Sequence, residues 1–230
     1  MEEPKDVDWS YMKELGFIDL SMQFCKPSFW LMASEMAELA YHNHDFEKAY
    51  QYAFSMKQEA GIAGDKGLLV NALYLMARIA RNSKPVDRDY VIRNYNKAIN
   101  NSVGYGEKHA DGIEVVPKFR LQLDLASFYS QEKMYSEAKE NIWAVIESLK
   151  GAGGWQWKIS DSERSLFTEE ADIESARLEL KQGFKLKAAQ ILSGLSSKRL
   201  KNDDDMRTSW GDIVIMERDM LQLMRLVTFE

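Results

Sequence analysis

Alanines that recur on both sides of short polar turns are the feature that most limits how this chain can fold. In three places an alanine is followed by another one twelve positions later, beyond a polar turn: Ala37 and Ala49, Ala126 and Ala138, and Ala176 and Ala188. Two helices can approach closely only where small side chains face each other across the seam between them. The pairs therefore predict antiparallel helical hairpins. Two further pairs at the same spacing fall across predicted loops and carry no weight in this prediction: Ala60/Ala72 and Ala98/Ala110.

The rest of the chain shows the same preference for helix. Prolines stand at positions 4, 27, 85 and 117, and the last three precede long runs without proline, as is typical of helix starts. The alternating, strand-like stretch WQWKI is too short to build a sheet. We predict an all-α chain of about ten helices: 9–24, 28–43, 46–60, 66–82, 87–102, 117–131, 135–150, 162–182, 184–196 and 208–228.

Composition and charge limit the compartment and the class of partner. The chain of 230 residues is 45% hydrophobic and 29% charged, as in an ordinary soluble protein, and its net charge of -6 argues against nucleic-acid binding. The single Cys25 cannot form an internal disulfide, and the acidic start lacks the apolar region of a signal peptide. We therefore expect a cytoplasmic protein without a membrane segment. We expect a disordered N-terminus over 1–7 and one domain over 8–230, with loops at 103–116 and 151–161.

The surroundings of the alanine pairs resemble the tetratricopeptide repeat, in which small residues let two antiparallel helices nest. An aromatic residue, Phe46 or Tyr135, lies three positions before the second alanine, and apolar residues follow it. The resemblance is best over residues 30–60, almost as good over 119–149 and poor over 174–195. It implies a right-handed superhelical stack of hairpins. The repeats are offset by 40, 49 and 50 residues against 34 in the family, so the chain resembles a degenerate, long-armed member. A generic helical bundle is the alternative.

The resemblance also assigns a concave face to the first helix of each hairpin. Its side chains are mixed polar and aromatic groups, which suit the capture of a peptide: Leu31, Ser34, Glu38, Tyr41 and His42; Asn71, Tyr74, Arg78 and Arg81; Arg120, Leu123, Ser127 and Gln131; Glu170, Ile173, Arg177 and Lys181. Arg78, Arg81 and Arg120 are the predicted partners for acidic groups on a ligand. An ordinary solvated face is the alternative.

Charge is segregated late in the chain. Residues 161–179 contain seven carboxylates, whereas residues 181–201 contain six basic residues and no acid. We interpret this as two neighbouring helices whose charges attract. The alternative is a basic patch for an acidic partner, which the following NDDDM at 202–206 would partly cancel.

Two apolar segments remain open to two interpretations each. Trp155 and Trp157 follow a glycine-rich lead, and they either fold back as a plug or form an interaction hot spot. The predicted helix at 208–228 is apolar on more than one side. It either caps the core or buries itself in a second subunit, which would give a homodimer.

Sequence signatures of catalysis are missing. The stretch GIAGDKG lacks the ending of a phosphate-binding loop, and the G-x-S-x-G and H-E-x-x-H patterns do not occur. His42, His44 and Asp45 have no further ligand cluster in the sequence, so we expect no metal and no cofactor. The sequence favours a non-catalytic module that binds a protein or peptide as an adaptor, chaperone-like carrier or scaffold. The alternative is the sensory or regulatory domain of a helical-repeat regulator that binds a small ligand or peptide.

Overall fold

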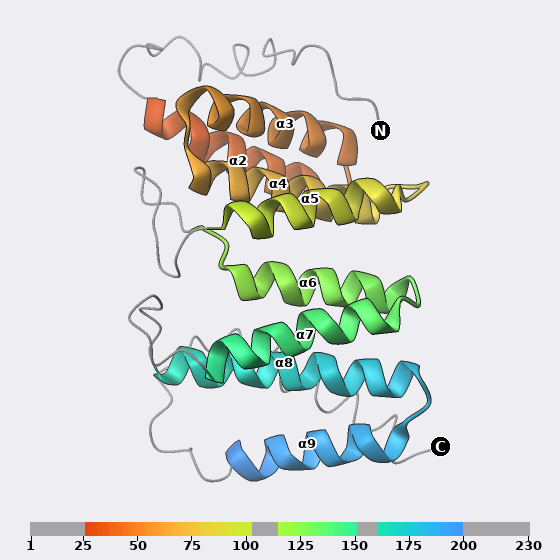
Figure 1. The fold of residues 1–230 in the computed structure, drawn as a ribbon. Helices are drawn as coiled ribbons and strands as arrows, with labels where there is room; N and C mark the ends of the chain where they lie inside the picture. Colours follow the sequence, from red (N-terminus) through yellow and green to blue (C-terminus); the bar gives the residue numbers. More distant parts are fainter. Residues whose placement is uncertain (1–25, 103–114, 151–160, 200–230) are drawn as a thin grey trace. The chain divides into compact units, whose positions relative to one another are not determined.

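The computed structural model describes residues 26–102, 115–150 and 161–199 (Figure 1). The chain divides into two compact units, and the boundary lies between Leu121 and Gln122. All regular structure in the described residues is α-helical, which confirms the predicted fold class for this part of the chain. The predicted N-terminal segment and the predicted helices at 9–24 and 208–228 lie outside it.

The first unit contains α2 (Lys26–His42), α3 (Phe46–Ala63), α4 (Lys66–Asn82) and α5 (Arg88–Asn101). In this unit α3 packs against both α2 and α4, and α4 packs against α5. Aspartates fix the starts of three helices, because their side chains accept a hydrogen bond from a backbone N–H of the first turn. These caps are Asp45 for α3, Asp65 for α4 and Asp87 for α5.

Contacts between successive hairpins of the first unit recur at a fixed spacing. Arg78 on α4 donates a hydrogen bond to Glu38 on α2, and these residues are 40 positions apart. The hydroxyls of Tyr50 on α3 and Tyr90 on α5 lie 2.7 Å apart in a buried hydrogen bond, again between residues 40 positions apart. Both contacts between the two hairpins thus join residues at the same separation in the sequence.

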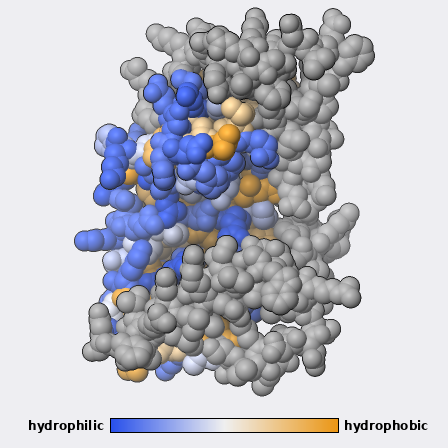
Figure 2. Space-filling view, turned by 180° about the vertical axis from the view of Figure 1, so that it is seen from behind, coloured by the Kyte–Doolittle hydropathy of each residue, from blue (hydrophilic) through white to orange (hydrophobic). Residues whose placement is uncertain are grey.

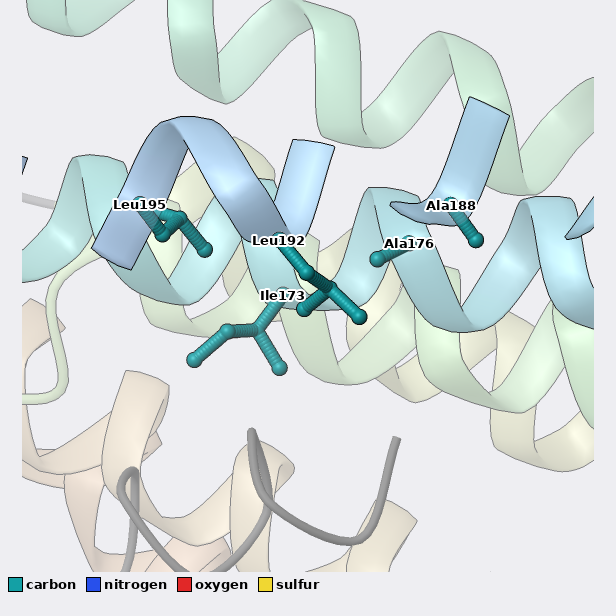
Figure 3. Packing of buried hydrophobic residues seen from close by; sticks show 5 residues of the cluster. All are labelled: Ile173, Ala176, Ala188, Leu192 and Leu195. Atoms are coloured by element: carbon teal, nitrogen blue, oxygen red, sulfur yellow. The ribbon is translucent and has the colours of Figure 1, made fainter. Parts of the chain in front are cut away.

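The second unit contains most of α6 (Lys118–Gln131), then α7 (Tyr135–Lys150), α8 (Asp161–Lys181) and α9 (Lys185–Arg199). Here α8 packs against both α7 and α9. A buried cluster fills the seam between the last two helices (Figure 3): Ile173 and Ala176 from α8, and Ala188, Leu192 and Leu195 from α9. The two alanines allow the close approach, and the larger side chains fill the space beside them.

The predicted alanine seams are confirmed as buried packing positions. All six alanines of the three hairpin pairs are buried. Ala60 and Ala72, which we expected to carry no weight, also lie in one buried cluster with Met56 and Leu68. That expectation was wrong because only Gly64 and Asp65 separate α3 from α4, so these alanines face each other across a further seam.

Three hairpin turns have the same backbone geometry. In the turns α2–α3, α6–α7 and α8–α9 the middle residue has a left-handed conformation: His44 (φ 60°), Lys133 (φ 63°) and Gly183 (φ 84°). The next residue donates its N–H to the carbonyl five residues earlier: Asp45 to Ala40 at 2.9 Å, Met134 to Tyr129 at 2.8 Å, and Phe184 to Glu179 at 2.8 Å. This is the bonding of a helix that ends in a Schellman turn. The left-handed residue always lies five positions before the second alanine of the pair, so seam and turn repeat together.

Few large hydrophobic side chains are exposed on the described residues: Leu39, Ile62, Val86, Trp143, Phe184 and Leu186. Seen from behind, the described surface is mainly hydrophilic, with small hydrophobic areas (Figure 2). Phe184 and Leu186 are two positions apart in one turn, whereas the other four are scattered along the sequence. None of the described helices is both long and apolar enough to cross a membrane.

Candidate functional site

The predicted face of the first unit contains a cluster centred on the guanidinium of Arg78. This group donates to the carboxylate of Glu38 over 2.7 Å. Its central carbon lies 4.7 Å from the centre of the Tyr41 ring and 5.4 Å from that of the Tyr74 ring. The amide of Asn82 in turn donates to the Tyr41 hydroxyl at 2.8 Å. We call these five residues the Arg78 cluster; it links α2 to α4, the first helices of successive hairpins.

The charge of Arg78 is well stabilised where it lies. Burial lowers the pKa of Arg78, but the neighbouring Tyr74, Glu38 and Tyr41 outweigh this effect and raise the pKa overall. The side chains of Arg78 and Glu38 are only 24% and 36% exposed, so salt screens this pair less than a pair on the open surface. A guanidinium between two aromatic faces is further held by cation–π attraction. The cluster therefore presents two tyrosine rings and a compensated ion pair. We predicted Arg78 as a partner for acidic ligand groups, but it already has an internal carboxylate.

Further predicted residues of this face surround the Arg78 cluster. The exposed His42 ring meets the Tyr41 ring edge-on at 5.5 Å, and its Nε2 lies 3.7 Å from a Glu38 oxygen. Ser34 on α2 and Arg81 on α4 are half-buried, and Leu31 falls within α2. The predicted residues Glu38, Tyr41, Tyr74 and Arg78 thus lie together, whereas Asn82 was not predicted because its place in the cluster depends on contact with the other hairpin.

The N-terminal half of α4 is covered by the chain itself. The side-chain oxygen of Asn71 accepts a hydrogen bond from the backbone N–H of Val116 at 2.9 Å. A Cβ atom added to Gly67 would lie 2.7 Å from a methyl group of Val115, so the close approach requires glycine. Asn71, which we predicted to bind a partner, therefore holds the segment that leads into α6. Gly67 at the start of α4 was the one sequence signal of this contact.

In the later hairpins two residues of the predicted face lie in the core instead. Leu123, which we predicted to bind a partner, is 3% exposed and belongs to the core, and Ile173 is buried too. The residues that follow them, Asp124 and Glu174, interact electrostatically, and Arg177 also donates to Glu174. Burial raises the pKa of Glu174 and Asp124 adds to this, while Arg177 opposes it.

The remaining predicted residues of these hairpins lie at the surface or between surface and core. Half-buried are Arg120 and Ser127 on α6 and Glu170 on α8; exposed are Gln131 at the end of α6 and Lys181 at the end of α8. Trp155 and Trp157 lie outside the described residues. Among those that are described, no group of three or more His, Cys, Asp or Glu is arranged to hold a metal ion.

Comparisons with known proteins give no family assignment: neither a protein-family model, nor a curated protein, nor a solved structure matches this chain.

Proposed function

We propose that this chain is a tetratricopeptide-repeat-like stack of helical hairpins that binds a protein or peptide without catalysis. It would act as an adaptor, carrier or scaffold. The Arg78 cluster is the observation that carries the proposal, because tyrosine and arginine are enriched among the residues that contribute most to binding at protein interfaces. The shared turns and the 40-residue spacing of the Glu38–Arg78 and Tyr50–Tyr90 bonds support a repeating stack.

The contacts within the Arg78 cluster indicate how a partner is bound. Tyr41 and Tyr74 are already held by Arg78, so little side-chain freedom is lost when a peptide packs against them. Glu38 is partly exposed, with one oxygen on Arg78 and the other 3.7 Å from Nε2 of His42, so its carboxylate can accept from a donor on a partner that approaches beside the His42 ring. The face therefore suits a peptide with an apolar or aromatic side chain beside an N–H or ammonium group.

A displayed library of random peptides, panned against the full chain, tests this proposal. The affinity of an enriched peptide is then measured by fluorescence anisotropy for the wild type and for variants. Tyr41→Ala is expected to weaken binding by about ten-fold or more, the usual effect of truncating a hot-spot residue. Gln58→Ala, at an exposed position of α3, is the matched control and leaves the affinity unchanged.

A charge swap separates recognition from folding. Glu38→Arg combined with Arg78→Glu keeps an ion pair but exchanges the two charges, so the fold should persist while the selected peptide is lost. Failure to enrich any peptide would contradict the proposal, as would peptides that bind both variants as tightly as the wild type. A small molecule that raises the melting temperature in the absence of any peptide ligand would instead favour the regulatory alternative.

A further inference from the structure

The side chains of the α8–α9 turn differ in chemistry from those of the α2–α3 and α6–α7 turns, which have the same backbone conformation. The residue after the left-handed one precedes the second helix and so takes its N-cap position: Asp45, Met134 and Phe184. Two positions later come Glu47, Ser136 and Leu186. Only the α8–α9 turn combines large apolar groups at both positions, where Phe184 is 48% and Leu186 is 82% exposed.

Helix stability does not account for these two residues. An N-cap side chain normally accepts a hydrogen bond from the first turn, as Asp45 does from the N–H of Lys48, and phenylalanine has no acceptor. Leu186 exposes most of its surface, so it contributes little to the core. Departures from local preference without a gain in packing are typical of functional surfaces.

Lysines flank the two exposed apolar residues in the sequence. Lys181, Lys185 and Lys187 are exposed in the same seven-residue stretch, which contains no acid. The ammonium of Lys187 lies 4.8 Å from the centre of the Phe184 ring. Lys185 stands at the position that holds the aromatics Phe46 and Tyr135 in the other two turns. Residues 181–187, which we call the lysine turn, thus combine apolar and positive groups at one end of the hairpin (Figure 1).

We propose that the lysine turn docks onto an anionic lipid surface. Phe184 and Leu186 would enter the interfacial layer of the bilayer while the lysines meet the lipid phosphates, the combination by which peripheral segments bind membranes. This site is independent of the Arg78 cluster and of the peptide proposed to bind there.

Two arguments favour lipid over an acidic peptide. The lysine turn lies at the end of a hairpin (Figure 1), a position from which exposed side chains can enter a deformable surface. All three cations are lysines, which act as point charges towards a diffuse anionic surface, whereas paired recognition of single carboxylates favours arginine.

Flotation of the full chain with lipid vesicles tests the proposal. We expect binding to vesicles that contain phosphatidylserine with phosphatidylcholine, none to phosphatidylcholine alone, and loss of binding at high salt. Lys185→Gln with Lys187→Gln should weaken binding about 25-fold, from about five-fold per lysine. Lys97→Gln with Lys139→Gln, at exposed positions of α5 and α7, removes the same charge elsewhere and should leave binding intact.

Phe184→Asp separates insertion from folding. It supplies an N-cap and so preserves or strengthens α9, yet it should abolish vesicle binding. The proposal is overturned if the wild type does not float with phosphatidylserine vesicles at low salt. It is equally overturned if the lysine-turn variants float as well as the wild type, or if they lose only the binding of an acidic amphipathic peptide, which would indicate a protein partner.

Discussion

The α2–α3 and α8–α9 hairpins share their turn geometry but differ in the side chains that the turn carries. Each has a buried alanine pair and a left-handed turn residue five positions before the second alanine. In α2–α3 the turn is held by side chains: Asp45 caps α3, and the Phe46 ring lies 5.9 Å from Tyr41 and 5.8 Å from His44. In α8–α9 the left-handed residue is a glycine, which adopts this conformation without strain. The buried alanines and the left-handed turn residue are thus common to both hairpins, whereas the side chains beside Gly183 are not needed to hold its turn.

The largest expected loss of stability comes from truncating the core residue that occupies the same position in each of the two hairpins. Met56 and Leu195 each lie seven positions after the second alanine, and both are fully buried. Met56→Ala and Leu195→Ala should each lower the free energy of unfolding by about 3 kcal/mol. Hydrogen exchange should show lost protection in the unit that carries the substitution. Equal losses in both units from either variant would contradict separate cores.

Enlarging an alanine tests the seam itself. Ala37→Leu and Ala176→Leu should each destabilise the chain by about 2 kcal/mol, because the facing helix leaves no room for the added carbons. Ala63→Leu, at an exposed position near the end of α3, serves as the control and should change stability by less than about 0.5 kcal/mol. If seam and control variants melt alike, the small residues do not set the distance between helices.

The smallest effect should come from exchanging the two N-caps. Asp45→Ala removes a cap and should lower the stability by about 1 kcal/mol, whereas Phe184→Asp adds one and should raise it by a similar amount. The hydrogen bond with Lys48 holds the pKa of Asp45 below its ordinary value of 3.8, although burial opposes this. A depressed pKa in the folded state means that this stabilisation is present above the unfolded pKa and is lost as the pH falls through the folded one. Urea titrations of the wild type and Asp45→Ala should therefore differ at neutral pH and converge in strong acid. A difference that persists unchanged in acid would rule out the carboxylate as its source.

Sequence reasoning located the helices because their periodicity and turns are local. The predicted helices 66–82 and 135–150 coincide with α4 and α7. The prediction for α3 ended three residues early, at 60, because either of two glycines satisfied the pattern for a helix end. Gly61 stays helical, and Gly64, with φ 67°, terminates the helix.

The side-chain contacts within the Arg78 cluster could not be predicted from local sequence patterns. The resemblance to the tetratricopeptide repeat assigned Glu38, Tyr41 and Arg78 to one face, but their mutual contacts depend on how two hairpins meet. The repeat register assigned Leu123 to the concave face although a leucine side chain favours burial. Leu123 lies in the core, and the adjacent Asp124 is half-buried. An alignment of the three turns on their alanines would have revealed Gly183 as the marker of the left-handed position.

The two hydrogen bonds between the first and second hairpins also restrict the number of residues that can lie between them in the sequence. Glu38–Arg78 and Tyr50–Tyr90 span equal lengths of chain, 40 residues each, and the stretch from Tyr50 to Arg78 is common to both. Adding or deleting one residue within the α3 or α4 part of this stretch would rotate the two sides of that helix by about 100° against each other and disturb the register of these bonds. Among homologues, the length of this stretch should therefore vary less than its residue identities.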